Sequence, residues 1–278
     1  MPYAINRHNL DNSGQPIDDE LKIHYETSGP RNSAKGALVF AHGFTLDWRL
    51  WLGQLEYFGA GKDCFAVAFD SRGHGLSDAP KTGYSRDHRE TDLKAVVDEL
   101  KLEKFHLIGL SMGGATAIGF AIDYPERLES LTLVSSSVTA YNPSGYQDAL
   151  TKLAREKDVE AARERWIEAG LRYNDFKSDE ARNLMETMMR EHSAAPWGDP
   201  NRGGYQHRND LELLEEMNVR TLILVGEKDL KFITMGEKLR DAIPGSKMEI
   251  VSNVGHVINI EVPDQFNTRL ETWIERGE

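Results

Sequence analysis

Short apolar runs alternate with helix-like segments along most of this chain. Six apolar runs lie at residues 36–44, 64–75, 105–111, 128–137, 219–229 and 246–256, and the first of them resembles a strand buried on both faces. An alternating segment that is typical of a strand precedes them at residues 21–27. Apolar residues recur at helical spacing in four further segments, at residues 91–102, 115–125, 236–244 and 263–277. This order predicts an α/β fold whose mostly parallel sheet is covered by helices on both faces.

The alternation stops between residues 139 and 216. That stretch is helical in pattern, rich in charged residues and free of strand-like runs, and it lies between two strands of the predicted sheet. We interpret it as a helical cap, or lid, inserted into a core that is formed by residues 1–138 and 217–278. Because ligands bind at the carboxyl ends of parallel strands, we expect the cap to fold over those ends.

Composition excludes several classes of function. The net charge is −12, whereas binding of nucleic acid or of an anionic membrane needs basic patches. No segment approaches the 18 apolar residues of a membrane span, and the N-terminus lacks the apolar core of a signal peptide. The single cysteine, Cys64, cannot form a disulfide within the chain. We therefore expect a soluble, cytoplasmic protein without membrane insertion, either a monomer or a homodimer, that acts on a small molecule.

No cofactor or metal is expected. A glycine-rich dinucleotide fingerprint with an acidic residue about 20 positions later is absent, and so is a phosphate-binding loop of the GxxxxGK type. The loop "DSRGHGLSD" (70–78) contains Asp70, His74 and Asp78, but these residues do not make up a closed set of metal ligands.

The segment "GLSMGG" (109–114) fits the G-x-S-x-G pattern of a nucleophile elbow, because it follows a strand and precedes a helix. In such a turn the serine, here Ser111, stands exposed at the N-terminus of the helix. Side chains two positions before and after it would collide with neighbouring backbone, which explains Gly109 and Gly113.

A serine hydroxyl needs a base, and the base needs an acid that orients it. Two strands after the elbow end in suitable residues, Asp229 in "GEKD" and His256 in "NVGH". Their order, acid and then histidine, is the one found with this type of elbow. We predict that His256 accepts the proton of Ser111 and that Asp229 orients the imidazole, although Asp229 is also placed to cap the helix that follows it.

An acyl-transfer site also needs backbone N–H groups that bind the developing oxyanion. The N–H of Met112, next to the nucleophile, is one candidate. The second is the N–H of Phe44, because His42 and Gly43 turn the chain directly after an early strand.

Five motifs together resemble the α/β-hydrolase fold superfamily over nearly the whole chain. They are "AHGF" (41–44), "DSRGHGLSD" (70–78), "GLSMGG" (109–114), "GEKD" (226–229) and "NVGH" (253–256). The resemblance is to the serine-nucleophile branch, which includes carboxylesterases and 3-oxoadipate enol-lactonases. It implies hydrolysis of an ester or lactone through an acyl-enzyme on Ser111, and it implies that His42, like His74, supports the oxyanion loop. A serine at the elbow argues against haloalkane dehalogenases and epoxide hydrolases, which carry aspartate there.

Three alternatives stay open. "HGFTLDWRLW" and "GEKDLKF" resemble the menaquinone-pathway synthase that uses the same triad for an elimination. This chain departs from that pattern, since Ala115 stands where an arginine is usual and Leu110 where an aromatic residue is usual. Hydrolysis of carbon–carbon bonds and binding of a small molecule without turnover are the other two.

The substrate pocket is the least constrained part of the site. Trp48 follows the oxyanion loop and is placed either to line the pocket entrance or to pack on the next helix. Aromatic residues of the cap are candidates for its own core or for the substrate wall. The residues assigned to the pocket are Trp48, Leu110, Tyr141, Trp166 and Val257.

Overall fold

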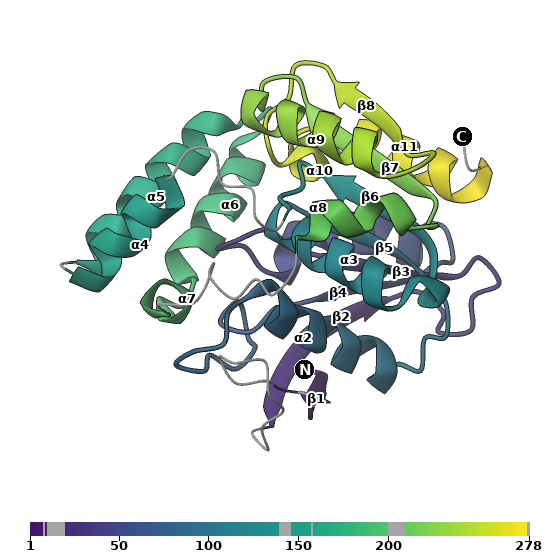
Figure 1. Cartoon of the computed structure of the whole chain (residues 1–278), viewed down its shortest axis with the longest axis horizontal. Helices are drawn as coiled ribbons and strands as arrows, with labels where there is room; N and C mark the ends of the chain where they lie inside the picture. Colours follow the sequence, from purple (N-terminus) through teal and green to yellow (C-terminus); the bar gives the residue numbers. More distant parts are fainter. Residues whose placement is uncertain (8, 10–19, 139–145, 157, 200–208, 277–278) are drawn as a thin grey trace.

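The structure, a computed structural model, describes residues 1–7, 9, 20–138, 146–156, 158–199 and 209–276 (Figure 1). Within these residues the strands form one eight-stranded sheet in the order β1-β2-β4-β3-β5-β6-β7-β8. Their bounds are β1 (Tyr3–Asn6), β2 (Leu21–Ser28), β3 (Ala37–Ala41), β4 (Phe65–Phe69), β5 (Phe105–Leu110), β6 (Leu128–Val134), β7 (Thr221–Gly226) and β8 (Lys247–Val251).

The sheet is parallel from β4 through β8, and only the first two strands run antiparallel to their neighbours. The predicted mostly parallel α/β sheet is therefore confirmed. Strand β1 is not among the predicted strands, since it is only four residues long and lies at the edge of the sheet. Such a short edge strand contains too few residues to give a recognisable pattern.

Helices cover both faces of the sheet, as predicted. One face packs on α2 (Arg86–Glu99), α3 (Met112–Asp123), α8 (Asp210–Leu213) and α9 (Leu230–Ala242). The other face packs on the 3₁₀ helix η1 (Trp48–Trp51), the π-helix η2 (Leu55–Ala60), α10 (Ile258–Glu261) and α11 (Pro263–Arg276). Three one-turn segments complete the core: α1 (Leu52–Gln54), η3 (Pro125–Arg127) and η4 (Leu214–Glu216).

Alternating strand residues separate the two hydrophobic layers. In β3, for example, Val39 faces the layer under α2 and α3, whereas Leu38 and Phe40 face the layer under η1 and α11. All three side chains are fully buried. This two-sided burial is the reason that the inner strands β3 to β7 read as continuous apolar runs in the sequence.

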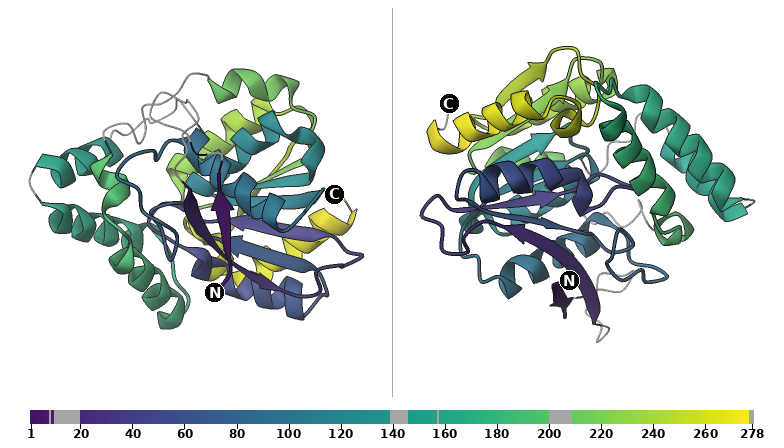
Figure 2. Two further views of the ribbon diagram at one scale, coloured as in Figure 1. Left: turned by 90° about the horizontal axis from the view of Figure 1, so that it is seen from below. Right: turned by 180° about the vertical axis from the view of Figure 1, so that it is seen from behind.

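Of the helices that the structure describes between β6 and β7, all but α8 and η4 lie to one side of the sheet (Figures 1 and 2). We call them the cap helices; they are α4 (Tyr146–Glu156), α5 (Val159–Tyr173), α6 (Asp179–Glu191) and α7 (Ala195–Gly198). Buried side chains of α5 and α6, such as Ile167 and Met188, join the hydrophobic layer under η1 and α11. The exact division of the chain into a core and a cap stays a prediction.

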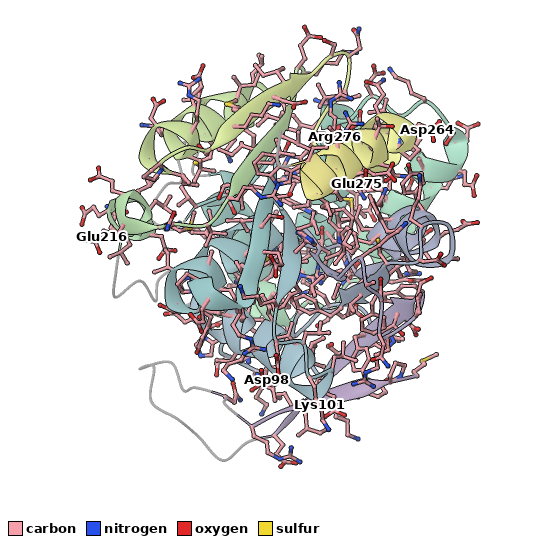
Figure 3. All side chains as sticks on the ribbon, turned by 90° about the vertical axis from the view of Figure 1, so that its right-hand side faces the viewer. Asp98, Lys101, Glu216, Asp264, Glu275 and Arg276 are labelled. Atoms are coloured by element: carbon pink, nitrogen blue, oxygen red, sulfur yellow. The ribbon has the colours of Figure 1, made fainter. Side chains whose placement is uncertain are left out.

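The two ends of the strands differ in their surroundings. Figure 3 shows the side on which the strands begin, where Asp98 and Lys101 precede β5 and Glu216 precedes β7. The candidate residues Ser111, Asp229 and His256 follow the last residues of β5, β7 and β8, so they belong to the opposite edge of the sheet.

Candidate active site

Ser111 occupies a strained turn between β5 and α3. Its φ of 54° lies in the left-handed region, which is unusual for a residue other than glycine and which costs free energy. The turn is held by neighbouring chain: the Ser111 N–H donates to Val134 O (3.0 Å), and the Ser137 hydroxyl donates to Ser111 O (2.9 Å). The side chain remains partly exposed at the N-terminus of α3.

The glycines around Ser111 are required by close backbone approach. A Cβ atom added to Gly109 would lie 2.4 Å from Gly113 O, and one added to Gly113 would lie 2.3 Å from Ala41 O. Both distances are far below van der Waals contact, and both would be to rigid backbone. The glycines thus allow α3 to start directly against β5 and the end of β3.

Asp229 and His256 form a hydrogen-bonded pair where β7 and β8 end. The distance from His256 Nδ1 to Asp229 Oδ2 is 2.6 Å. A carboxylate only accepts hydrogen bonds, so Nδ1 carries the proton and Nε2 is the ring atom available as a base. The Asp229 side chain is almost fully buried, whereas the His256 side chain is 20% exposed. The Phe232 ring of α9 packs on the imidazole, with 4.5 Å between the ring centroids.

The loop that carries His256 is held by two polar residues that sequence reasoning missed. Asn174 Oδ1, at the end of α5, accepts hydrogen bonds from the backbone N–H groups of His256 (2.9 Å) and Val257 (3.0 Å). The buried Glu261 carboxylate accepts from Gly255 N–H (2.8 Å). Their partners are backbone groups, which every residue type provides, so no sequence pattern predicts these contacts. The only feature that could have indicated Asn174 is that a polar residue stands at the end of a helix.

The oxyanion loop lies beside the elbow. A Cβ added to Gly43 would stand 3.6 Å from Ser111 Cβ and 2.8 Å from Leu110 Cδ2. The Ser71 N–H donates to His42 Nε2 (3.0 Å), so His42 Nδ1 carries the proton and donates to Gly43 O (2.8 Å). Burial lowers the pKa of His42, which keeps this ring neutral. In the part of the chain that the structure describes, the Met112 N–H contacts no acceptor.

The Phe44 ring packs among aromatic side chains from both the core and the cap. The centroid distances are 5.3 Å to His192, 5.5 Å to Trp166, 5.8 Å to Trp197 and 5.8 Å to His74. Burial, with the neighbouring His192 and His42, lowers the pKa of His74 well below its usual range, so His74 is also neutral. The cluster joins the oxyanion loop to α5, to the end of α6 and to α7.

The structure brings some predicted residues together and leaves others apart. Ser111 and His256 follow strands of the same sheet edge but, among the described residues, share no hydrogen bond. The Trp48 ring lies 6.0 Å from the ring of His24 in β2, in a tilted contact.

The remaining pocket residues are placed as follows. Leu110 and Val257 are fully buried in the layer under η1 and α11, and the partly exposed Trp166 packs against that layer. Tyr141 lies outside the described residues.

Three further properties of the described residues concern metal binding, thiol chemistry and membrane spans. No group of three or more His, Cys, Asp or Glu side chains there is arranged to hold a metal ion. Burial raises the pKa of the Cys64 thiol, which disfavours the reactive thiolate. None of the helices in the described ranges is both long and apolar enough to cross a membrane.

Comparison with known proteins agrees with the architecture. A family model of the alpha/beta hydrolase fold matches residues 36–263. A Bacillus subtilis protein with the provisional name 2-succinyl-6-hydroxy-2,4-cyclohexadiene-1-carboxylate synthase is 29% identical over 269 residues, which cover 90% of this chain and 93% of that protein. The 3-oxoadipate enol-lactonase 2 of Acinetobacter baylyi is 26% identical over 271 residues, covering 92% and 94%. A thermophilic esterase from Thermogutta terrifontis, 22% identical, has the same fold, with a TM-score of 0.82 and 99% of each chain covered.

Proposed function

The chain belongs to the alpha/beta hydrolase fold family, and from that premise we propose that it cleaves a carboxylic ester or lactone of a small molecule through an acyl-enzyme on Ser111. The observation that carries the proposal is the 2.6 Å hydrogen bond between His256 Nδ1 and Asp229 Oδ2. These two residues follow β7 and β8 at the same edge of the sheet at which the strained Ser111 follows β5. The 3-oxoadipate enol-lactonase among the similar proteins supports the choice of substrate class.

The chemistry follows from the atoms that each residue offers. His256 Nε2 accepts the Ser111 proton as Oγ attacks the carbonyl carbon, and Asp229 stabilises the imidazolium that forms. The N–H groups of Met112 and Phe44 donate to the oxyanion of the tetrahedral intermediate. The imidazolium then protonates the leaving alkoxide, and the Ser111 ester remains. Water, deprotonated by His256, attacks that ester and releases the acid, which restores Ser111.

The missing hydrogen bond between Ser111 and His256 is compatible with this role. Catalytic hydrogen bonds are often long or poorly aligned in an unliganded enzyme, and they tighten when substrate binds. The partial exposure of both side chains leaves room for the small shift that this requires.

The second candidate is a triad-dependent elimination. It is supported by the Bacillus subtilis relative, whose provisional name describes a synthase and which matches this chain over nearly its whole length. In that reaction His256 and Ser111 remove a proton from carbon, and no acyl-enzyme forms. The two candidates share their residues and differ in whether Ser111 becomes esterified.

The test is hydrolysis of p-nitrophenyl esters, from acetate to decanoate, by the wild type and by variants. We expect Ser111→Ala and His256→Ala each to lower kcat by at least about 10³-fold, and the double variant to lose no more than either single one. Ser252→Ala, which changes an exposed serine outside the triad, is the matched control and retains wild-type rates. Equal turnover by Ser111→Ala would refute the mechanism. Folded wild type without esterase activity would favour elimination, which is then assayed on a cyclic diene precursor.

A further inference from the structure

We propose that Trp166 and Asn174, both on the cap, are positioning residues that set the geometry of the two catalytic loops. Trp166 lies on α5, and Asn174 directly follows it. Trp166 holds the loop of the oxyanion donor Phe44, and Asn174 holds the loop of the catalytic base His256. The proposal rests on the proposed function of Ser111 and His256, and it assigns to the cap a part in the reaction beyond covering the substrate.

The first contact fixes the backbone of the base. One oxygen, Asn174 Oδ1, accepts both the His256 N–H at 2.9 Å and the Val257 N–H at 3.0 Å. The amide nitrogen of the same side chain donates to Gly170 O at 2.6 Å. The two backbone N–H groups are donors and Gly170 O is an acceptor, so only this orientation of the Asn174 amide satisfies all three partners.

The surrounding backbone leaves the His256 loop little freedom. Glu261 Oε2 accepts from the N–H groups of both Asp175 (2.7 Å) and Gly255 (2.8 Å), so it ties the segment after α5 to the residue before the base. A Cβ added to Gly255 would stand 2.3 Å from Tyr173 O. The cap therefore meets this loop backbone to backbone, and Asn174 is the side chain there that accepts from the backbone of the base.

The second contact fixes the oxyanion loop. Trp166 Nε1 donates to Thr45 Oγ1 at 2.7 Å, and this hydroxyl donates to Phe44 O at 2.6 Å. Thr45 has a φ of 64° and is 1% exposed. A β-branched residue in the left-handed region is strained and keeps that conformation only when its surroundings hold it there. The neighbouring Phe44 N–H is the proposed oxyanion donor, so its direction depends on this turn.

Another contact between the cap and the core provides a control. The exposed Glu191 carboxylate of α6 pairs with Arg49 at 2.6 Å, and among the described residues neither side chain shares a hydrogen bond with the His256 loop or with residues 43–45. If the cap only needs to be attached to the core, loss of this pair should resemble loss of the other two contacts. If Trp166 and Asn174 position catalytic groups, loss of either of their contacts should lower kcat, whereas loss of the Glu191–Arg49 pair should not.

The experiment compares Trp166→Phe, Asn174→Ala, Asn174→Asp and Glu191→Gln in hydrolysis of p-nitrophenyl acetate. Misplacement of a reacting group by about 1 Å can cost up to about 100-fold in rate. We therefore expect kcat to fall about 10- to 100-fold in Trp166→Phe and Asn174→Ala, with KM changed by less than about 3-fold. Asn174→Asp keeps an acceptor for both N–H groups but loses the donor to Gly170 O, so it should recover only part of kcat. Its added negative charge near the imidazole should move the acid limb of the kcat/KM profile to higher pH. Glu191→Gln should keep wild-type kcat and KM.

Amide hydrogen exchange keeps the test independent of the substrate. The amides of His256 and Val257 should exchange faster in Asn174→Ala than in wild type or Glu191→Gln, at unchanged far-UV circular dichroism. If the wild type hydrolyses no ester, the proposed function fails, but the exchange result still decides whether Asn174 holds the loop. Unchanged exchange in Asn174→Ala, an equal loss of kcat in Glu191→Gln, or a change in KM alone in the two cap variants would overturn the proposal.

Discussion

Close approach of backbone atoms restricts position 113 of the nucleophile elbow to glycine. At position 113 the helix and the end of β3 approach so closely that even a methyl group has no space, since an added Cβ would lie 2.3 Å from Ala41 O and 2.6 Å from His42 O. The same approach places the oxyanion loop beside Ser111, and it therefore couples the stability of the turn to the geometry of the reaction.

We expect Gly113→Ala to lower the free energy of unfolding by about 1–3 kcal/mol, the range observed for overpacked sites, and to lower esterase kcat as well. Gly53→Ala is the matched control, because nothing lies within 4 Å of a Cβ added there on the helical α1. Alanine in a helix should leave stability unchanged or raise it by up to about 1 kcal/mol. Urea unfolding of both variants measures the difference, and equal stabilities would contradict the steric explanation.

At this scale the sequence predicts site residues that stand near the ends of apolar runs. It does not predict residues whose side chains hydrogen-bond to backbone groups. Ser111, Asp229 and His256 were identifiable because each lies at, or a few residues after, the end of an apolar run. Asn174 and Glu261 act through N–H groups that every residue except proline possesses, so neither spacing nor residue type marks their partners. Whether the three residues act as a triad stays a prediction.

At the scale of elements, burial and length determined which segments were recognisable. The five inner strands β3 to β7 are covered on both faces and appeared as apolar runs. Of the two edge strands, β8 was also predicted although only Val251 is buried in it, whereas the four-residue β1 was not. Helix α2 begins at Arg86, five residues before the predicted start at residue 91. Its first turns contain buried polar residues, among them Arg86 and Glu90, which form an ion pair inside the protein, so the apolar period begins only later.

The N-terminus of α5 offers a test at this scale. Asp158 Oδ1 accepts from the N–H groups of Glu160 (2.9 Å) and Ala161 (3.1 Å) and so caps the helix that carries Trp166. We expect Asp158→Ala to destabilise α5 by about 1 kcal/mol and to speed amide exchange in its first turn, whereas Asp158→Asn retains the cap. Hydrogen exchange resolved by residue checks this, and identical exchange in both variants would contradict it.

On the scale of the whole molecule, a buried histidine makes folding depend on pH. Burial, together with the positive charge of Arg220, lowers the pKa of His106 in β5 to about 4. His106 is 8% exposed, and its Nδ1 is hydrogen-bonded to Ser130 Oγ at 2.8 Å. Between pH 6.5 and 4 the unfolded chain therefore binds a proton that the folded chain does not.

This histidine's contribution to stability is complete above pH 6.5 and is lost as the pH falls toward 4, with a slope of at most about 1.4 kcal/mol per pH unit. We expect His106→Gln, which cannot titrate, to show a smaller loss of stability between pH 7 and pH 4.5 than the wild type. Urea unfolding at a series of pH values gives both curves. Parallel curves would mean that His106 does not contribute to the acid sensitivity.

The fold, the strained elbow and the Asp229–His256 pair converge on one claim, that Ser111 is a nucleophile activated by His256. The most direct measurement is active-site titration with a p-nitrophenyl phosphonate ester, followed by peptide mass spectrometry. We expect one p-nitrophenolate to be released per chain, with the phosphonyl group on Ser111, and almost none to be released by Ser111→Ala or His256→Ala. Labelling of another residue, or equal release by Ser111→Ala, would contradict the claim.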